Sequence, residues 1–401
     1  MKKIKKMPLI LSLIVLVLSF SACSKTVSNK PKEQTKNENM EKTKNGDTKE
    51  TKNAGKSTSG TISDDLYKYQ VSINGVVYSF PTSFSTFQKN GWVGEDFGNV
   101  KLEPNQYTLK NIRNGQQSMM VKIANFGINV SPLSECHIGG IRIESDTKKQ
   151  GAIISIAKGI TIDSTYDEVI AAYGKPSDEY KGTSLTKLTY KSGIYSNYKI
   201  SIDIKTKKVS CIEIENLVKP AKTQTTSVNT ELPAIVKNYK APSSIGNDLF
   251  SFQVKYGGNL YKLPAPIAEL EKNGWVLQSN ANEVIAAKSS AVGIELRKDN
   301  QILKTQIQNY SDKAEPLKHC FVTYMEYYNN GAQIHLELPK GISEKSSIDQ
   351  VIAAYGQPTK VDEGSSFKHY EYGKIFRKVT FVTNKGKIEK IEVSHFPKKL
   401  D

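Results

Sequence analysis

The sequence predicts an α+β protein of two repeated modules, each with short helices packed on mainly antiparallel β-sheet. Three motifs recur in the same order and at nearly constant spacing: Lys-Asn-Gly-Trp at 89–92 and 272–275, Pro-Leu-x-x-Cys at 132–136 and 316–320, and Ile-Ala-Ala-Tyr-Gly-x-Pro at 170–176 and 352–358. Collinear matches of this kind indicate an internal duplication. The modules are expected at 66–217 and 247–397. Residues 218–246, which are rich in Lys, Thr, Pro and Ser, are the predicted linker.

The longest predicted helix of each module carries its own start and stop signals. Ser164 can cap the first turn, with Asp167 three residues on in a capping-box arrangement. Gly174 and Pro176 are typical of a helix end. One apolar face is formed by Tyr166, Val169, Ile170 and Tyr173. The second module repeats the pattern with Ser346, Ile348, Asp349, Val351, Ile352, Tyr355, Gly356 and Pro358.

A shorter helix is predicted around Phe84 and Phe87, where the Asn-Gly pair that follows would end it. We expect Trp92 to fold back onto its apolar face. The corresponding residues of the second module are Ile267, Leu270 and Trp275.

Strand-like runs surround these helices. Residues 70–80 have Asn-Gly at their centre, and residues 250–263 have Gly-Gly in the matching place, which predicts two hairpins. Alternation of apolar and polar residues predicts further strands with one buried face at 199–204, 212–215, 376–382 and 391–393.

The end of each module, at 155–217 and 338–397, resembles a known architecture. The residues that carry the resemblance are Gly159, Ile160, Thr161, Ser164, Asp167, Glu168, Val169, Tyr173, Gly174 and Pro176. This pattern is similar to the small lipoprotein of the outer-membrane barrel-assembly machine and to β-lactamase inhibitory protein. The resemblance implies a short helical segment on an antiparallel sheet, and protein binding as the function. The tandem arrangement also resembles lipoproteins of low-GC Gram-positive bacteria.

The amino terminus has the pattern of an export signal. Four lysines precede an apolar run at 7–20, which has the length of a signal-peptide core and is too short to span a bilayer comfortably. The Phe-Ser-Ala-Cys run that ends at Cys23 resembles a bacterial lipobox, although leucine is usual where Phe20 stands. We therefore predict a lipoprotein signal peptide at 1–22 and lipid attachment at Cys23. An ordinary secretory signal with an incidental cysteine is the alternative.

Residues 23–65 are predicted to form the lipidated cysteine and a disordered polar stalk, because they hold few apolar side chains to offset the entropy of ordering. The chain would then be lipid-anchored on the extracytoplasmic face of the cell membrane. Its formal net charge of +16 is concentrated in part in the leader and the stalk. Scattered lysines and scarce arginines argue against nucleic acid as a partner. An anionic membrane or wall polymer, or an envelope protein, fits better.

Residues with catalytic chemistry do not recur between the modules. None of the five histidines has a counterpart, and metal-protease, paired Cys-x-x-Cys and Gly-x-Ser-x-Gly motifs are missing from the sequence. Cys136–His137 and His319–Cys320 are conceivable nucleophile pairs, but adjacent strand residues point to opposite faces, so the two side chains of each pair are not expected to meet. Cys136 and Cys320 are better explained as small buried apolar residues. We predict no catalytic site and no cofactor.

The remaining polar groups have structural explanations as well. Beside Cys23 the chain has an odd number of cysteines, Cys136, Cys211 and Cys320; a Cys136–Cys211 bridge is conceivable, with Cys211 expected on an exposed strand face. Asp163, Asp167 and Glu168 favour a helix start more than a calcium site. The 20 tyrosines suit either strands or a binding face.

Taken together, the sequence predicts a membrane-tethered lipoprotein that binds or scaffolds an envelope protein or a cell-wall component without catalysis. Two alternatives stay open. One is a cell-wall-acting enzyme with its site between the modules, and the other is a proteinaceous inhibitor.

Overall fold

The computed structural model describes residues 60–221, 228, 230–329 and 334–400. The predicted signal peptide, Cys23 and most of the predicted stalk lie outside the described residues. We call residues 60–221 the first region and residues 230–400 the second region. Among the described residues, no helix combines the length and the apolar character needed to cross a membrane.

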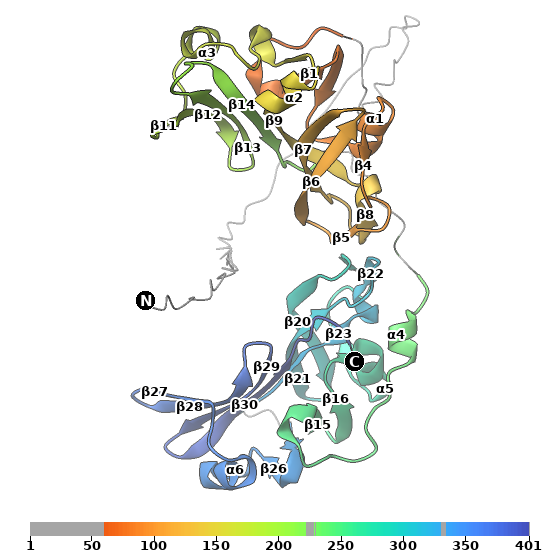
Figure 1. Cartoon of the computed structure of the whole chain (residues 1–401). Helices are drawn as coiled ribbons and strands as arrows, with labels where there is room; N and C mark the ends of the chain where they lie inside the picture. The colour runs from red at the N-terminus through yellow and green to blue at the C-terminus, as the bar shows by residue number, and fades with distance from the viewer. Residues whose placement is uncertain (1–59, 222–227, 229, 330–333, 401) are drawn as a thin grey trace, which may run out of the picture. The chain divides into compact units, whose positions relative to one another are not determined.

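Antiparallel β-sheet dominates both regions, and the helices are short (Figure 1). The predicted fold class, α+β with mainly antiparallel sheet, is therefore confirmed. The α-helices of the described residues are α1 (Phe84–Gln88), α2 (Ser145–Lys149), α3 (Tyr166–Tyr173), α4 (Ala234–Lys237), α5 (Ile267–Lys272) and α6 (Ile348–Tyr355). The 3-10 helices are η1 (Leu66–Lys68), η2 (Leu133–Glu135), η3 (Ala157–Gly159), η4 (Leu249–Ser251), η5 (Leu317–His319) and η6 (Pro339–Gly341).

The first region contains one long sheet, a small sheet and a short strand pair. The long sheet runs in the order β11 (Asp178–Lys181), β12 (Leu185–Gly193), β13 (Ser196–Asp203), β14 (Val209–Asn216), β9 (His137–Glu144), β7 (Gln117–Ala124), β6 (Tyr107–Asn114) and β4 (Val93–Gly94), with β3 (Thr82–Ser83) beside β9. The small sheet has the order β10 (Ile154–Ser155), β1 (Gln70–Ile73) and β2 (Val76–Ser79). The short pair is β5 (Lys101–Leu102) with β8 (Ser131–Pro132).

The second region divides its strands among more sheets. One runs β24 (Tyr324–Tyr328), β30 (Lys387–His395), β29 (Arg377–Asn384), β28 (Phe367–Lys374) and β27 (Lys360–Glu363). A second runs β17 (Ala265–Pro266), β23 (Phe321–Val322), β21 (Gln301–Gln308), β20 (Ser290–Lys298) and β18 (Val276–Leu277). The smaller ones are β16 (Asn259–Lys262), β15 (Gln253–Tyr256), β25 (Leu336–Leu338) and β26 (Ile342–Ser343), and the pair β19 (Val284–Ile285) and β22 (Glu315–Pro316). Strands β11 and β27 each lie at the end of a sheet.

The two predicted hairpins are present as β1–β2 and β15–β16. Asn74 and Gly75 both have positive φ, 51° and 80°, as a two-residue turn of this type requires. Gly257 and Gly258 take the same kind of conformation, at 55° and 87°. The local turn signals in the sequence therefore fix both hairpins.

Helices α3 and α6 lie where they were predicted, but each capping residue is one position later than expected. Thr165 accepts a hydrogen bond from the Glu168 backbone N–H at 3.2 Å, and the Glu168 carboxylate accepts one from the Thr165 N–H at 2.7 Å. Ser347 and Gln350 form the same capping box in α6. The predicted caps Ser164 and Ser346 were wrong. Aspartate at the third helical position is one methylene shorter than glutamate or glutamine, the residues that complete this box.

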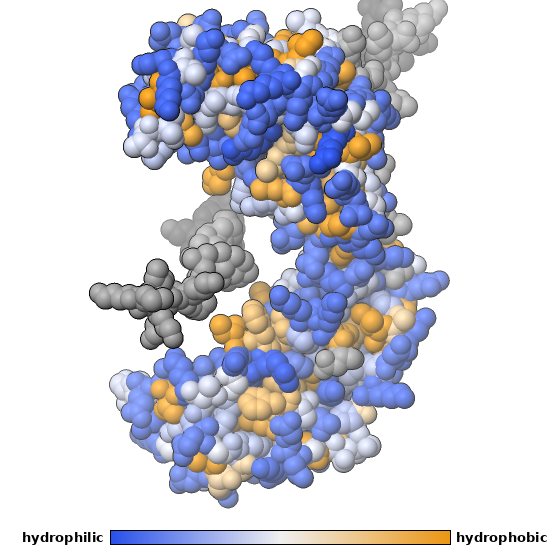
Figure 2. All heavy atoms as spheres, viewed as in Figure 1, coloured by the Kyte–Doolittle hydropathy of each residue, from blue (hydrophilic) through white to orange (hydrophobic). Residues whose placement is uncertain are grey.

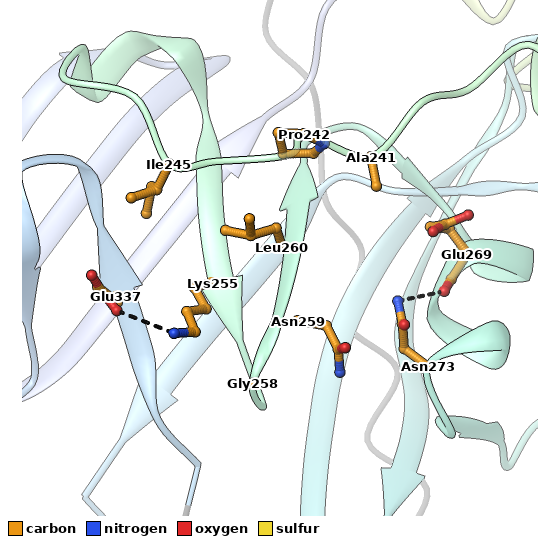
Figure 3. Close-up of a pocket in the computed structure, with 10 residues that line it drawn as sticks. All are labelled: Ala241, Pro242, Ile245, Lys255, Gly258, Asn259, Leu260, Glu269, Asn273 and Glu337. Carbon is orange, nitrogen blue, oxygen red and sulfur yellow. Dashed lines mark hydrogen bonds and ion pairs between the residues drawn. The ribbon is translucent and has the colours of Figure 1, made fainter.

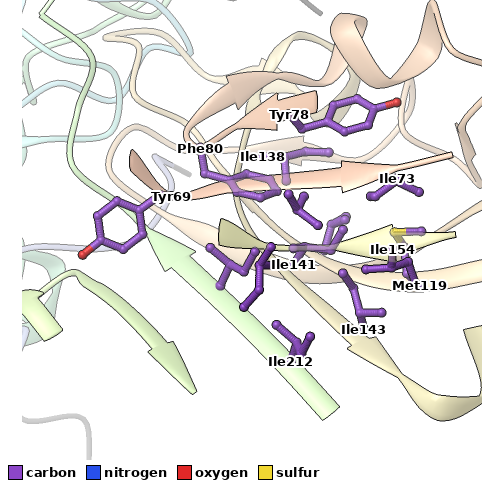
Figure 4. Close-up of a cluster of buried hydrophobic side chains, with 14 of the residues drawn as sticks. Tyr69, Ile73, Tyr78, Phe80, Met119, Ile138, Ile141, Ile143, Ile154 and Ile212 are labelled. Atoms are coloured by element: carbon purple, nitrogen blue, oxygen red, sulfur yellow. The ribbon is translucent and has the colours of Figure 1, made fainter. Parts of the chain in front are cut away.

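The core of the first region lies between the small sheet and one face of the long sheet (Figure 4). Figure 4 labels Ile73, Tyr78 and Ile154 of the small sheet and Ile141 and Ile212 of the long sheet, all of which belong to this core cluster. Of these residues, Ile212 lies in the run 212–215, whose alternation predicted a strand with one buried face, and its side chain is buried in this core. Each fully buried large apolar side chain contributes roughly 1.5–3 kcal/mol.

The second region has a separate core cluster, which shares no residue with the first. Its helix α5 buries Ile267 and Leu270, and Trp275 packs in the same cluster, as predicted. Helix α4 falls inside the predicted linker 218–246. There Val236 is buried against Tyr310 and Phe321, so this part of the segment is packed on the second region.

Candidate functional site

The three cysteines of the described residues are free and buried. The Cys136 thiol lies 3.4 Å from the Pro132 carbonyl oxygen, and the Cys320 thiol lies 3.8 Å from that of Pro316. Burial raises the pKa of each thiol to about 12, with a smaller contribution from Glu135 at Cys136 and from Glu315 at Cys320. At neutral pH both groups are therefore uncharged and poor nucleophiles.

Cys211 was predicted on an exposed strand face, and that prediction was wrong. The residue is only 7% exposed. It pairs with Glu144 on β9 and with Ser201 on β13, where the ladder contains a bulge. By the strand register, the thiol shares its sheet face with the charged side chains of Arg142, Glu144 and Glu213.

The histidines occupy unrelated environments. His319 is buried with its Nδ1 3.1 Å from Glu315 Oε2, and His395 is buried with its Nδ1 2.7 Å from the Leu263 carbonyl oxygen. His335 Nδ1 lies 2.8 Å from Glu344 Oε1, and His369 is exposed on β28. His137 is half-buried, and burial lowers its pKa. None of these contacts joins a histidine to a cysteine.

The acidic residues near α3 serve the local structure. Asp163 is ion-paired with Lys148 at 2.6 Å, and this hydrogen-bonded pair lowers the pKa of the Asp163 carboxyl. Glu168 completes the capping box, as described above. Within the residues that the structure describes, no group of three or more His, Cys, Asp or Glu side chains is arranged to hold a metal ion.

An open cleft of about 440 Å³ lies beside the β15–β16 hairpin (Figure 3). Its charged groups are Lys255, Glu269 and Glu337; Lys255 lies 3.9 Å from Glu337. Asn273 donates a hydrogen bond to the Glu269 carbonyl oxygen at 3.0 Å, which closes the end of α5. The lining contains no Cys, Ser or His, and its only ionisable side chains are Lys255, Glu269 and Glu337.

A network of charged groups lies on the second region's sheet of strands β24, β30, β29, β28 and β27, on the face opposite the core. We call it the outer charged face, and its residues are Tyr324, Glu326, Glu371, Lys378, Lys390 and Glu392. Lys390 Nζ lies 2.9 Å from Glu326 and 2.8 Å from Glu392. The Tyr324 hydroxyl lies 2.6 Å and 2.8 Å from the same two carboxylates. Lys378 pairs with Glu371 at 2.9 Å.

The long sheet of the first region carries a similar network. Arg142 contacts Glu144 at 2.7 Å and Glu213 at 2.9 Å, and Lys122 is ion-paired with Glu215. Hydrogen bonds fix both networks in place while the groups stay partly open to solvent. Polar side chains that are already ordered lose little entropy when a partner binds.

Replacement of Lys390 with methionine tests whether its ion pairs stabilise the outer charged face. Although burial acts to raise it, hydrogen bonds from Lys390 and Tyr324 hold the pKa of Glu392 below its usual value. A lowered carboxyl pKa stabilises the fold above the unfolded-state pKa, and that stability is lost as the pH falls through the folded-state pKa. We expect Lys390→Met to cost about 1–3 kcal/mol at neutral pH and to move acid unfolding to higher pH.

Urea unfolding across a pH series measures this effect. The matched control is Lys368→Met, because the exposed pair of Lys368 with Glu363 is worth at most about 1 kcal/mol. Equal stability of Lys390→Met and the wild type at every pH would contradict the prediction.

Two hairpin turns expose adjacent large apolar side chains. In the first region Ile194 is 88% exposed and Tyr195 is 61% exposed, at the turn between β12 and β13. The Leu217 backbone N–H donates to the Tyr195 carbonyl oxygen at 2.8 Å, which brings the end of β14 beside the turn. Exposed Val218 follows, and exposed Tyr67 of η1 completes the group. We call these five residues the first hairpin-tip patch.

The second region has the same arrangement. Ile375 is 82% exposed and Phe376 is 61% exposed, at the turn between β28 and β29. The Phe396 N–H donates to the Phe376 carbonyl oxygen at 2.8 Å, and the two rings lie 6.3 Å apart. Exposed Phe250 belongs to η4, as Tyr67 belongs to η1. These four residues form the second hairpin-tip patch.

Neither hairpin-tip patch was predicted from the sequence. The available signal was an apolar pair, Ile-Tyr at 194–195 and Ile-Phe at 375–376, between two strand-like runs where a polar turn is usual. Figure 2 shows, on one face, small hydrophobic areas within a largely hydrophilic surface. The tyrosines were expected either on strands or on a binding face, and the buried strand residues among them include Tyr78, Tyr190, Tyr198, Tyr256, Tyr261 and Tyr372.

Neither a protein-family model, nor a characterised protein, nor a solved structure matches the chain.

Proposed function

We propose that the chain is a membrane-tethered extracytoplasmic lipoprotein whose two repeated modules bind an envelope protein or a cell-wall component without catalysis. The observation that carries the proposal is the outer charged face, where a hydrogen-bonded network is fixed in position yet open to solvent. The tether is the lipid predicted at Cys23. Preorganised charges of both signs favour specific recognition of a polar surface.

Duplication is supported by contacts that recur beyond the sequence motifs. Lys158 Nζ donates to the Ala172 carbonyl oxygen at 2.6 Å, and Lys340 Nζ donates to that of Ala354 at 2.5 Å. The Tyr190 hydroxyl donates to the Gly174 carbonyl oxygen at 3.0 Å. Tyr372 and Gly356 make the same bond at 3.0 Å. These recurring residues stabilise helix ends, which is a structural role.

A non-catalytic role is supported by the state of the reactive groups. Burial makes the Cys136 and Cys320 thiols poor nucleophiles, and the histidines contact backbone or carboxylate groups instead. In the 440 Å³ cleft Lys255 is ion-paired with Glu337, and no Cys, Ser or His lines it.

Affinity capture from native membranes tests the proposal. The test variant exchanges the charges of one pair, Glu371→Lys with Lys378→Glu, which keeps net charge and the ion pair but changes the displayed pattern. The matched control exchanges Glu363→Lys with Lys368→Glu. These two residues are paired across β27 and β28, and by strand alternation Lys368 lies on the other face of the sheet from Glu371. We expect the wild type and the control to retain a partner and the test variant to lose at least about tenfold in capture.

Two results would count against the proposal. One is recovery of nothing above an unrelated lipid-anchored protein. The other is equal capture by the test variant, once circular dichroism shows that it is folded.

A further inference from the structure

We infer that the two hairpin-tip patches insert their apolar side chains into the interface of an anionic lipid bilayer. This contact is distinct from recognition through the outer charged face. The inference rests on the proposed function in one respect, because the lipid at Cys23 would keep a bilayer within reach of the patches.

The shape of both patches suits insertion into a bilayer. Ile194 and Ile375 have the largest exposed fractions, 88% and 82%, among the exposed large hydrophobic residues of the described part of the chain. They stand at the ends of strand hairpins, so they project outward and do not line a groove. A stable protein interface buries about 800 Å² on each partner, more than two projecting side chains offer. A fluid bilayer interface can accept such a projection without a complementary pocket.

The side chains of both patches are of the types that bilayer interfaces accept. Each patch combines an aliphatic residue with aromatic ones, Tyr67 and Tyr195 in the first and Phe250 and Phe376 in the second. Aromatic side chains favour the headgroup level of a bilayer, and aliphatic ones favour the acyl boundary. The same combination at the same turn of both regions is not explained by core packing, since these residues are exposed.

Exposed basic side chains accompany both patches. Exposed Lys68 and Lys191 lie next to the first patch in the chain, and exposed Lys374 and Arg377 flank the second. Exposed Lys219 also follows Val218. The nearby carboxylates keep their charge: exposed Asp64 precedes Asp65, which accepts the Tyr67 N–H, and Asp248 accepts the Phe250 N–H, each bond being 2.9 Å long. Basic groups beside an apolar projection match a negatively charged membrane surface.

Side-chain contacts hold both turns in place, so the turns need not become ordered when they bind. The Tyr69 hydroxyl lies 2.5 Å from Ser192 Oγ, which ties η1 to the first turn. Arg377 lies 3.5 Å from the Phe250 carbonyl oxygen and 5.6 Å above the Phe252 ring, which ties η4 to the second turn.

Tryptophan reporters test the inference in the chain that carries Cys23→Ala and lacks the predicted signal peptide 1–22, so that neither a lipid nor the apolar run at 7–20 holds it on the vesicles. The reporters are Ile194→Trp and Ile375→Trp, and the matched control is Ile153→Trp, which is 75% exposed away from both patches. The probe is vesicles of phosphatidylglycerol and phosphatidylcholine in equal parts. Emission from both reporters is expected to shift to the blue and to be quenched by brominated lipid, while the control is unaffected. Native Trp92 and Trp275 are buried and give a constant background.

Affinity provides the second readout. Replacing Ile194 and Ile375 together with serine is expected to weaken vesicle binding by about tenfold. Lys191→Gln with Lys374→Gln should weaken it severalfold and reduce its salt dependence.

Three results would overturn the inference. The first is tip reporters whose emission does not change with vesicles, and the second is an equal change in the Ile153→Trp control. The third is a change seen with native membranes only before protease treatment, which would make the occupant a protein. Partner capture that persists while the reporters stay silent would leave the proposed function standing and remove only the bilayer contact.

Discussion

Replacing Trp275 with alanine is expected to lower the free energy of unfolding of the second region by about 3–5 kcal/mol, the usual cost of deleting a large buried aromatic side chain. Trp275 is 1% exposed, and its ring stacks on Tyr256 with centroids 5.5 Å apart. Its backbone N–H donates to the Leu270 carbonyl oxygen at 3.1 Å, which fixes the turn after α5. Because that turn is held in place, the chain cannot collapse to fill the cavity.

Hydrogen exchange measured by mass spectrometry shows where the effect lies. The two core clusters share no residue, so we expect Trp275→Ala to reduce protection in 249–395 and leave 66–216 protected. Trp92→Ala should do the reverse. Val276→Ala, at an exposed neighbour, is the control and should cost at most about 0.5 kcal/mol. Equal loss of protection in both regions would show a single cooperative unit and contradict the expectation.

Replacing Cys23 with alanine is expected to abolish lipid attachment completely. Acyl transfer to this position needs the thiol as its acceptor, so no other side chain can substitute. Labelled fatty acid should enter the wild-type chain and not the variant, and the variant should be found outside the membrane fraction or held there only weakly. Two or three acyl chains hold a protein far more firmly than one chain or a few apolar side chains.

The control for this experiment is Cys211→Ala, which removes a buried thiol and should leave labelling unchanged. Equal labelling of the wild type and Cys23→Ala would end the lipoprotein assignment. Membrane retention of unlabelled Cys23→Ala would be evidence for the hairpin-tip patches only where residues 1–22 have been removed, since an uncleaved apolar run at 7–20 holds the chain on the membrane by itself.

Local signals predicted much of the fold. Asn-Gly and Gly-Gly pairs placed both hairpins, and the apolar spacing of α3 and α6 placed both helices. The caps were displaced because Ser164 and Thr165 are both able to cap, and the choice depends on whether the acidic residue three positions later can reach back. Ser164 instead accepts a hydrogen bond from the Thr161 N–H at 3.1 Å. Such competition between neighbours is settled by tertiary geometry.

The site was less predictable than the fold. Burial of Cys211 depends on a bulge in β13–β14 and on the stems of charged neighbours, and alternation of residue types reveals neither. The partners within the outer charged face come from strands far apart in the chain, such as Tyr324 and Glu392. The hairpin-tip patches were missed because an apolar pair between strands also fits a strand interior.

The end strands β11 and β27 have a consequence for how copies of this protein coexist. Both are only four residues long, all of their residues are exposed, and both carry acidic and basic side chains. Unpaired backbone groups at a sheet edge can template association with another chain, and short, charged edges discourage it. Under the proposed lipid anchor, molecules would crowd into a plane, where edge-to-edge pairing is favoured by the high local concentration. Short, charged edge strands would then keep neighbouring copies from pairing into a common β-sheet.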